Sequence, residues 1–294
     1  MSININSNLN QVYYSKERKK RAVCSGTTIN IETFSPIENN FVFSSQLTHS
    51  NIISSLKFTS LKFGNNLVIA SIPSSTISIY KYIKLINTPG KWINTYSITD
   101  NALSGFDIIN NSTNLKIIII TSKGKALIYE SSDSNLLSFN CIWNCQVSLS
   151  PCNCVYVKEG IDEEFIIGTD KDGSNDLVKF YSYNPNLNNY QIDLRKRLSG
   201  LCYSIKCISW FYNVFKGVNY IAIFDANKEL SIWMLDGISE HAEKITKEVK
   251  INSMLVELKW DQTGNIVEGV DEKGNKTIIK KILNEEKFSI VYNN

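Results

Sequence analysis

The sequence predicts an all-β fold, and specifically a six-bladed β-propeller, from three observations. Short apolar strands of similar sequence recur along the chain at nearly equal intervals. Each of them follows a matching strand and a short polar turn, as in a β-hairpin. Ile also outnumbers Leu by 40 to 22 among the 294 residues, and the branched Cβ of Ile favours pleated sheet over helix.

The repeat is marked by one apolar residue in each of six strands, which read INIE, ISIY, LIYE, VKFY, LSIW and TIIK. Successive marks are separated by 48, 49, 52, 52 and 47 residues. A constant period of this length is typical of propellers and other repeat architectures. The six marks are Ile31, Ile79, Ile128, Phe180, Ile232 and Ile279.

Each repeat has room for four strands. Hairpin partners such as LVIASI and KIIIITS precede the marks, and alternating strands such as LSGFDII and LVELKW lie further upstream. Gly, Asn, Asp, Ser and Pro concentrate at the junctions, as turns require. Four strands in about 50 residues correspond to one propeller blade. We therefore expect a single domain with blades at about 9–47, 48–97, 98–150, 151–198, 199–250 and 251–294.

The bulk composition excludes several classes of protein. An apolar fraction of 43% with 20% charged residues describes a globular chain. A net charge of +3 is small for a general nucleic-acid binder, so we expect no direct nucleic-acid specificity. Purely apolar runs such as 117–120 are far shorter than the roughly 20 residues of a membrane helix, so we expect no membrane insertion. No secretory signal is visible, and we expect a soluble intracellular protein with reduced thiols.

The seven cysteines suggest packing rather than metal binding. Cys152 and Cys154 lie two apart in a predicted strand and point to one face, and Cys207 lies within a strand among Ile and Trp. Structural zinc sites need two close pairs on tight turns, whereas free Cys commonly packs as a small apolar group. We expect buried thiols, no metal and no other cofactor.

Catalytic motifs are equally scarce. The two histidines, His49 and His241, have no recognisable nucleophile or metal partner in the sequence, and no phosphate-binding Gly-rich loop occurs. Pairs such as Glu163–Glu164 are interpreted as surface charge, because adjacent strand residues point to opposite faces. We therefore expect no enzyme and no catalytic residues, although propeller active sites can assemble from distant loops.

The strongest local charge feature is a basic run near the N-terminus, between the strings YYS and AVCS. Clustered cations attract anions, so the run is a candidate nuclear-import signal or anion-binding patch. A solvated turn between two strands is the alternative. The residues are Lys16, Arg18, Lys19, Lys20 and Arg21.

Four strings resemble a known family. ALIYESSDSNLL, SLSPCNCVYV and IIGTDKDGSNDLVKFYSYNPNLNNYQ are similar to two successive blades of the WD-repeat nucleoporins homologous to the COPII coat protein Sec-thirteen. LVELKWDQTGNIVEGVDEKGNKTIIKK resembles the last blade of the same family. The repeats here end in IE, IY, YE, FY, IW and IK, where WD repeats commonly end in Trp-Asp.

The resemblance implies a WD-repeat-like propeller that is open and completed by a blade donated in trans. It implies a non-enzymatic scaffold subunit of the Y complex in the nuclear pore outer ring, and hence a part in mRNA and protein transport. The partners would be an α-helical scaffold nucleoporin that donates the blade and other outer-ring nucleoporins. The implied locations are the nucleus, nuclear envelope and nuclear pore complex, with a second role in nutrient signalling at the vacuolar or lysosomal membrane surface. The implied pairing residues are Gln11, Val12, Tyr13, Tyr14, Leu258, Trp260, Ile278 and Ile279.

Two alternatives stay open. The first is the COPII vesicle-coat propeller, which would act at endoplasmic-reticulum exit sites. The second is a propeller enzyme or small-ligand receptor, which would show convergent polar groups and carboxylates of strongly perturbed pKa. Core packing is the alternative role for each of the aromatic and aliphatic residues assigned to partner binding.

Overall fold

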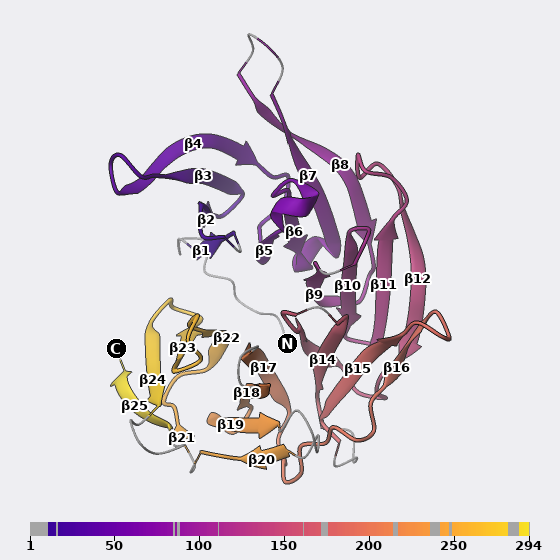
Figure 1. Ribbon diagram of the computed structural model, residues 1–294, viewed down its shortest axis with the longest axis vertical. Helices are drawn as coiled ribbons and strands as arrows, with labels where there is room; N and C mark the ends of the chain where they lie inside the picture. The colour runs from indigo at the N-terminus through magenta and orange to yellow at the C-terminus, as the bar shows by residue number, and fades with distance from the viewer. Residues whose placement is uncertain are drawn as a thin grey trace. The chain divides into compact units, whose positions relative to one another are not determined.

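The chain folds as a six-bladed β-propeller of consecutive antiparallel hairpins, and each blade is one β-sheet (Figure 1). The structure is a computed structural model. For residues 213, 218 and 290–293 only the backbone is described. The described residues are 11–15, 17–84, 86, 89–110, 112–160, 162–171, 176–213, 217–235, 242–246, 249–281 and 288–293.

The first three sheets each contain four strands in chain order. The first is β1 (Gln11–Tyr14), β2 (Lys20–Ser25), β3 (Thr28–Ser35) and β4 (Asn40–Thr48). The second is β5 (Ser55–Phe58), β6 (Leu67–Ser71), β7 (Thr76–Ile83) and β8 (Lys91–Thr99), with the short 3-10 helices η1 (Leu61–Phe63) and η2 (Ile72–Ser74) in its turns. The third is β9 (Leu103–Ile109), β10 (Lys116–Thr121), β11 (Lys125–Ser131) and β12 (Phe139–Gln146).

The other three sheets follow the same plan. The fourth is β13 (Cys152–Val157), β14 (Glu164–Thr169), β15 (Val178–Asn184) and β16 (Asn189–Ile192). The fifth is β17 (Ile205–Asn213), β18 (Val218–Asp225), β19 (Glu229–Leu235) and β20 (Ala242–Lys244), and β21 (Val249–Lys250) also pairs with β19. The sixth is β22 (Leu255–Trp260), β23 (Ile266–Asp271), β24 (Lys276–Lys281) and β25 (Phe288–Asn293).

The chain divides into two compact units. One consists of residues 1–103, 112–118 and 128–142, and the other of residues 104–111, 119–127 and 143–294. The first and second sheets lie in the first unit, and the fourth, fifth and sixth sheets lie in the second. The single-domain organisation, the blade limits and the open ring stay predictions.

The six mark residues of the repeat all lie in the core. Ile31, Ile79, Ile128, Phe180, Ile232 and Ile279 are each at most 2% exposed. Each of them lies in the third strand of its sheet. A side chain in a strand points out of one face of the sheet and can pack against the sheet next to that face. The period of the sequence therefore marks the same buried position in each sheet. Repeat proteins need such a position, because each repeat buries its apolar residues against its neighbours.

The first sheet differs between its two faces. Ala22 and Ile31 pair across β2 and β3 and belong to a core that includes Leu56 and Ile69 of the second sheet. On the opposite face, register aligns Tyr14, Arg21, Glu32 and Phe43 in one row across the four strands. Tyr14 and Phe43 in that row are 49% and 62% exposed.

The part of the chain that the structure describes contains no helix that is long and apolar enough to cross a membrane. The helices found there are the three-residue turns η1 and η2.

Phe165 in β14 is the centre of an aromatic cluster in the fourth sheet. It is fully buried, stacks on Tyr181 at 5.2 Å between ring centroids, and meets the edge of Trp143 at 5.8 Å. Truncation of a buried Phe removes apolar contacts and leaves a cavity. We expect Phe165→Ala to lower the free energy of unfolding by about 3–5 kcal/mol, measured by denaturant titration.

Leu149→Ala is the matched control, because Leu149 is 92% exposed. Its effect should stay within about 0.5 kcal/mol. Equal effects of the two substitutions would contradict the assigned core.

Candidate functional site

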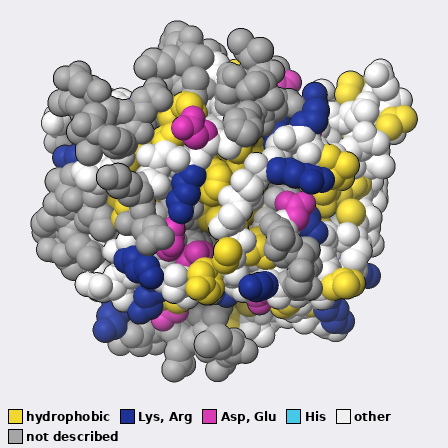
Figure 2. Space-filling view, turned by 90° about the horizontal axis from the view of Figure 1, so that it is seen from below, with side chains coloured by type: hydrophobic (Ala, Val, Ile, Leu, Met, Phe, Trp, Pro, Cys, Tyr) yellow, Lys and Arg dark blue, Asp and Glu magenta, His cyan; other side chains and the backbone are white. Residues whose placement is uncertain are grey.

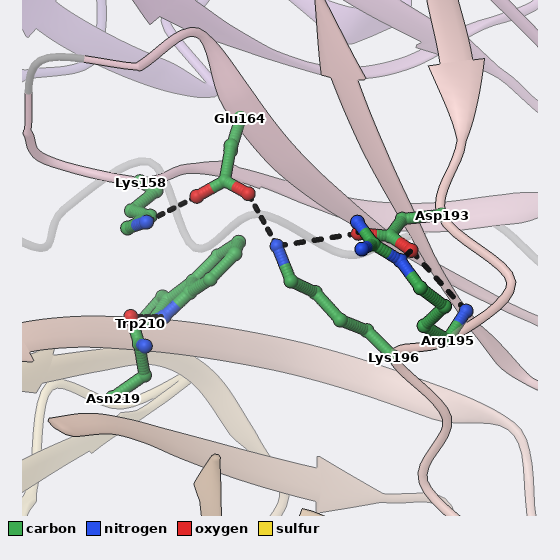
Figure 3. Close-up of polar contacts among 7 residues, drawn as sticks. All are labelled: Lys158, Glu164, Asp193, Arg195, Lys196, Trp210 and Asn219. Atoms are coloured by element: carbon green, nitrogen blue, oxygen red, sulfur yellow. Dashed lines mark hydrogen bonds and ion pairs between the residues drawn. The ribbon is translucent and has the colours of Figure 1, made fainter. Parts of the chain in front are cut away.

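Five charged side chains meet at one end of the fourth sheet and form what we call the charged cluster. Its members are Lys158, Glu164, Asp193, Arg195 and Lys196 (Figure 3). Lys158 directly follows β13, Glu164 begins β14, and the other three follow β16. All five lie in the second unit of the chain.

The hairpin between β13 and β14 brings the first pair together. The backbone N–H of Lys158 donates to the carbonyl of Glu164 at 2.9 Å, which closes the end of the hairpin. Asp107 of β9 fixes the preceding residue, because its carboxylate accepts the backbone N–H of Val157 at 2.9 Å. Lys158 and Glu164 are therefore held at the base of a loop that is exposed at Gly160.

The side chains form a chain of alternating sign. Lys158 donates to one carboxylate oxygen of Glu164, and Lys196 donates to the other. Lys196 also lies 3.4 Å from Asp193, which accepts both Nε and an Nη of Arg195 at 3.1 and 3.2 Å. Figure 3 shows Lys196 between the two carboxylates, with Lys158 and Arg195 at the ends of the cluster.

Two aromatic rings of β17 complete the surroundings of Lys158. Its ammonium nitrogen lies 5.4 Å from the ring centre of Trp210 and 4.6 Å from that of Tyr212. Trp210 is itself fixed, since its indole N–H donates to Asn219 Oδ1 at 3.0 Å. The rings exclude water on one side of the cation and attract it through their negative faces.

Burial and charge act in opposite directions on the two carboxylates. Burial raises the pKa of Glu164, but hydrogen bonds from Lys158 and Lys196, and their charges, outweigh it and lower the pKa below its usual value of 4.5. Burial likewise opposes the ionisation of Asp193, and the hydrogen bonds of Arg195 lower its pKa overall. Both groups are ionised at neutral pH, although their side chains are only 10% and 6% exposed.

This arrangement can serve acid–base chemistry. A carboxylate oxygen has two lone pairs, so an oxygen bonded to one ammonium can still accept a proton from a water molecule. An ammonium has three N–H donors, and fixed cations in a water-poor site stabilise negative charge that develops on a reacting oxygen. The cluster thus contains a base and two electrophilic groups within one network.

Glu164 corrects an expectation from the sequence. It was expected on the surface with Glu163, but it is 7% exposed and ion-paired. The available signal was its position directly before the apolar run FIIGT, which marks the start of a buried strand. Nothing in the sequence indicated that Asp193 and Lys196 would meet it.

The predicted partner residues of the first strand are divided between two environments. Val12 and Tyr14 are exposed, at 36% and 49%. Tyr13 packs against the buried core and its hydroxyl donates to the side-chain oxygen of Gln11 at 2.6 Å. Their role in partner binding stays a prediction.

The predicted partner residues of the last sheet are mostly packed inside. Leu258 and Ile279 are 4% and 0% exposed, and Ile278 is half-buried. Trp260 is partly buried, donates its indole N–H to the carbonyl of Ser209 at 3.1 Å and contacts the ring of Phe288. These contacts agree with core packing. The two predicted groups lie in different units, each described by itself.

The basic run is only partly a free turn. Arg18 and Lys19 are exposed between β1 and β2, whereas Arg21 pairs with Glu32 at 2.5 Å and lies over the ring of Phe41. Lys20 is half-buried, and Lys16 lies outside the described residues. On the face drawn in Figure 2, Lys and Arg side chains occur in several separate places among acidic and hydrophobic ones. An import or anion-binding role stays a prediction.

The cysteines are distributed over three environments. Cys24, Cys152 and Cys207 are buried, Cys145 and Cys154 are partly buried, and Cys141 and Cys202 are exposed. A bulge pairs Cys152 and Cys154 with the adjacent residues Thr169 and Gly168, so the simple alternation expected between them does not hold. Within the described ranges, no three His, Cys, Asp or Glu side chains are grouped so that they could hold a metal ion.

Comparison with known proteins relates the chain to other propellers by structure. No protein-family model and no curated protein matches it. A similar solved structure is a protein from Lactobacillus plantarum, with a TM-score of 0.66, 11% identity, and 96% and 83% of the two chains covered. Another is the periplasmic gluconolactonase PpgL of Pseudomonas aeruginosa, with a TM-score of 0.70, 8% identity, and 96% and 84% covered. At these identities the likeness concerns the fold.

These comparisons overturn the resemblance to the nucleoporins, because both similar structures are bacterial and neither is a nucleoporin or coat protein. The assignments to the Y complex or the COPII coat, to mRNA and protein transport, and to the nuclear pore or vacuolar surface are therefore wrong. The quoted strings consist of alternating strands and polar turns that propeller blades in general need. The expectation of no enzyme is not supported either, since a gluconolactonase shares the fold. The expected partners stay predictions.

The charged cluster should stabilise the fold in a pH-dependent way. Because the pKa of Glu164 is lowered in the folded state, its contribution is present above the unfolded pKa and is lost as pH falls through the folded pKa. We expect Glu164→Gln to lower the free energy of unfolding by about 3 kcal/mol near neutral pH. The difference from wild type should shrink on acidification, when measured by denaturant titration across pH.

Glu229→Gln is the control, because Glu229 pairs with Lys244 at 2.8 Å at a more exposed site. Its effect should not exceed about 1 kcal/mol. A Glu164→Gln effect that is constant over the acid range would contradict the assigned ion pairs.

Thiol reactivity should follow the three environments of the cysteines. Burial raises the pKa of Cys24 and Cys152 to about 12 and that of Cys207 well above its usual value, so their thiolates are scarce as well as shielded. We expect a thiol-reactive chromophore to label Cys141 and Cys202 rapidly and these three only on unfolding. A Cys141→Ser/Cys202→Ser variant should lose the rapid phase, and rapid labelling of Cys207 would contradict its burial.

Proposed function

We propose that the protein is an enzyme of the propeller type that hydrolyses the ester bond of a small lactone or ester, with the charged cluster as its site. The observation that supports this best is Glu164, a buried carboxylate that is kept ionised between two lysine ammonium groups. Burying charged groups costs free energy, and apolar residues of the same volume would give at least equal stability. Groups of perturbed pKa that converge in this way are typical of catalytic sites.

In this proposal Glu164 is the general base. It takes a proton from a water molecule as the water oxygen attacks the carbonyl carbon of the substrate, and an oxyanion forms on the carbonyl oxygen. The ammonium groups of Lys158 and Lys196 stabilise that oxyanion. The oxyanion then collapses, the carbon–oxygen bond to the leaving alkoxide breaks, and the protonated Glu164 returns its proton to the alkoxide. The products are a carboxylic acid and an alcohol. When the substrate is a lactone, both groups belong to the same molecule, a hydroxy acid.

The surroundings of the cluster suit this chemistry. Trp210 and Tyr212 keep one side of Lys158 dry, which strengthens its interaction with a developing negative charge. Lys158 and Glu164 stand at the facing ends of β13 and β14, so the sheet fixes their positions. Lys196 lies in the segment that follows β16 and is held by its ion pairs with Glu164 and Asp193. The fold is also shared with a gluconolactonase, a protein named for a lactone substrate.

The direct test is hydrolysis of neutral lactones by the full chain, starting with glucono-δ-lactone, followed as proton release with a pH indicator. We expect turnover by the wild type. Glu164→Gln should lower kcat by about 10²-fold or more, because it removes the base and keeps the shape. Lys158→Met should lower kcat by a similar factor, because it removes one cation from the oxyanion and keeps the length of the side chain.

Glu268→Gln is the matched control, since Glu268 forms an ion pair with Lys276 at 2.9 Å in a more exposed part of the sixth sheet. It should keep the wild-type rate. Thermal unfolding of each variant separates lost activity from lost structure. The proposal is wrong if the wild type hydrolyses none of the lactones, or if folded Glu164→Gln retains full activity.

A further inference from the structure

The outer strand of the first sheet, β4, is an edge strand of nine residues. It is the last strand in the order of its sheet, and among the described strands it pairs with β3 (Figure 1). The backbone N–H and C=O groups along the other edge of such a strand are a template for pairing with a further strand. The question is which strand this edge fits.

β4 lacks two features that commonly keep edge strands apart. Its sequence, NFVFSSQLT, contains no charged residue and no Pro, whereas the outer strands β8 and β20 contain Lys or Glu. Charged side chains and Pro oppose pairing at an edge. A bulge at Ser44, whose hydroxyl donates to the carbonyl of Ile31 at 3.0 Å, interrupts β4. Residues 40–43, before the bulge, are therefore its regular half.

This regular half is apolar and accessible on both faces. Phe43 and Val42 are 62% and 37% exposed, and they lie on opposite faces because adjacent strand residues alternate. Phe41 lies on the same face as Phe43, and its ring meets those of Tyr14 and Phe34 edge-on, at 5.8 and 5.5 Å between centroids. Tyr14 and Phe34 are themselves 49% and 36% exposed. Adjoining exposed apolar side chains of this kind mark surfaces of association.

The order of side chains in the regular half is complementary to itself. When two copies of β4 pair antiparallel about Val42, the two Val42 side chains lie opposite each other. Phe41 of each copy then lies opposite Phe43 of the other. Cross-strand aromatic pairs stabilise a sheet. The pairing is two-fold symmetric, so both copies use the same surface and the association closes at two.

We propose that β4 pairs with β4 of a second copy of this chain, so that the two first sheets form one continuous sheet in a symmetric dimer. The two strands run antiparallel and are centred on Val42. The aromatic side chains beside them, Phe41 and Phe43 of both copies, form a shared cluster on one face. The dimer does not depend on the proposed hydrolysis, because the first sheet and the charged cluster lie in different units of the chain.

Sedimentation velocity of the full chain over a wide range of concentration tests the dimer. We expect the wild type to sediment as a dimer that dissociates on dilution. Val42→Lys should raise the Kd of the dimer about tenfold or more, because it places two ammonium groups opposite each other at the centre of the pairing. The fold should be kept, since residue 42 is accessible in the monomer, and thermal unfolding checks this.

Ile142→Lys is the matched control, because Ile142 is 43% exposed in β12, another uncharged outer strand. This variant should dimerise like the wild type. A wild type that is monomeric at every concentration, or that forms assemblies larger than a dimer, would overturn the inference. Equal Kd values for the wild type and Val42→Lys, or loss of the dimer in Ile142→Lys, would do the same.

Disulfide cross-linking tests the register. A Cys141→Ser/Cys202→Ser background removes the two exposed thiols. In it, Val42→Cys should form a disulfide between two copies on mild oxidation, since residues directly opposite in an antiparallel pair have Cα atoms about 5 Å apart. Thr48→Cys is the control, because Thr48 is exposed but the two copies of it would be about 40 Å apart at roughly 3.3 Å per residue. Cross-linking of both variants alike, or of neither, would contradict pairing about Val42.

Discussion

The fourth and fifth sheets have apolar side chains on both faces, and the structure around them depends on covering both. In the fourth and fifth sheets, Ile166 and Phe180 share one core with Ile208 and Trp210. The other face of the fifth sheet, with Phe224, packs on the sixth sheet in a second core. A single sheet could not bury these residues alone, so stability requires neighbouring blades of matched size. The constant period of the sequence follows from this requirement.

The close packing of the sheets also determines how the charged cluster is built. Because packed sheets exclude water, a charge placed among them must be paired by another charge or by hydrogen bonds. The order Lys158, Glu164, Lys196, Asp193 and Arg195 satisfies this by strict alternation of sign, from a buried end to an exposed one. A network of this kind becomes more useful for stability as temperature rises, since the desolvation cost of ions falls.

Much of the fold could be predicted from the sequence, because it repeats a local pattern. The hairpins and the burial of marks such as Ile79 and Ile232 follow from strand alternation and turn chemistry within about 50 residues. The candidate site could not be predicted in this way. Glu164 and Lys196 are 32 residues apart and meet only through the return of the chain after β16. Alternation also failed at Cys152 and Cys154, where a bulge shifts the register. The family resemblance failed for a related reason, since strands and turns recur in unrelated propellers.

Residues 193–198, directly after the fourth sheet, are anchored at both ends, which limits how this protein can change over evolutionary time. The ends of this segment are held by the backbone hydrogen bond of Asp193 to Phe180 and by the burial of Leu198, so an inserted residue would pull one anchor out of place. The turn between β15 and β16 consists of exposed residues, with Leu187 60% exposed, so extra residues there would displace no buried side chain. New length should therefore accumulate at the outer turns of this protein, while the segment beside the charged cluster keeps its size and varies only in its side chains.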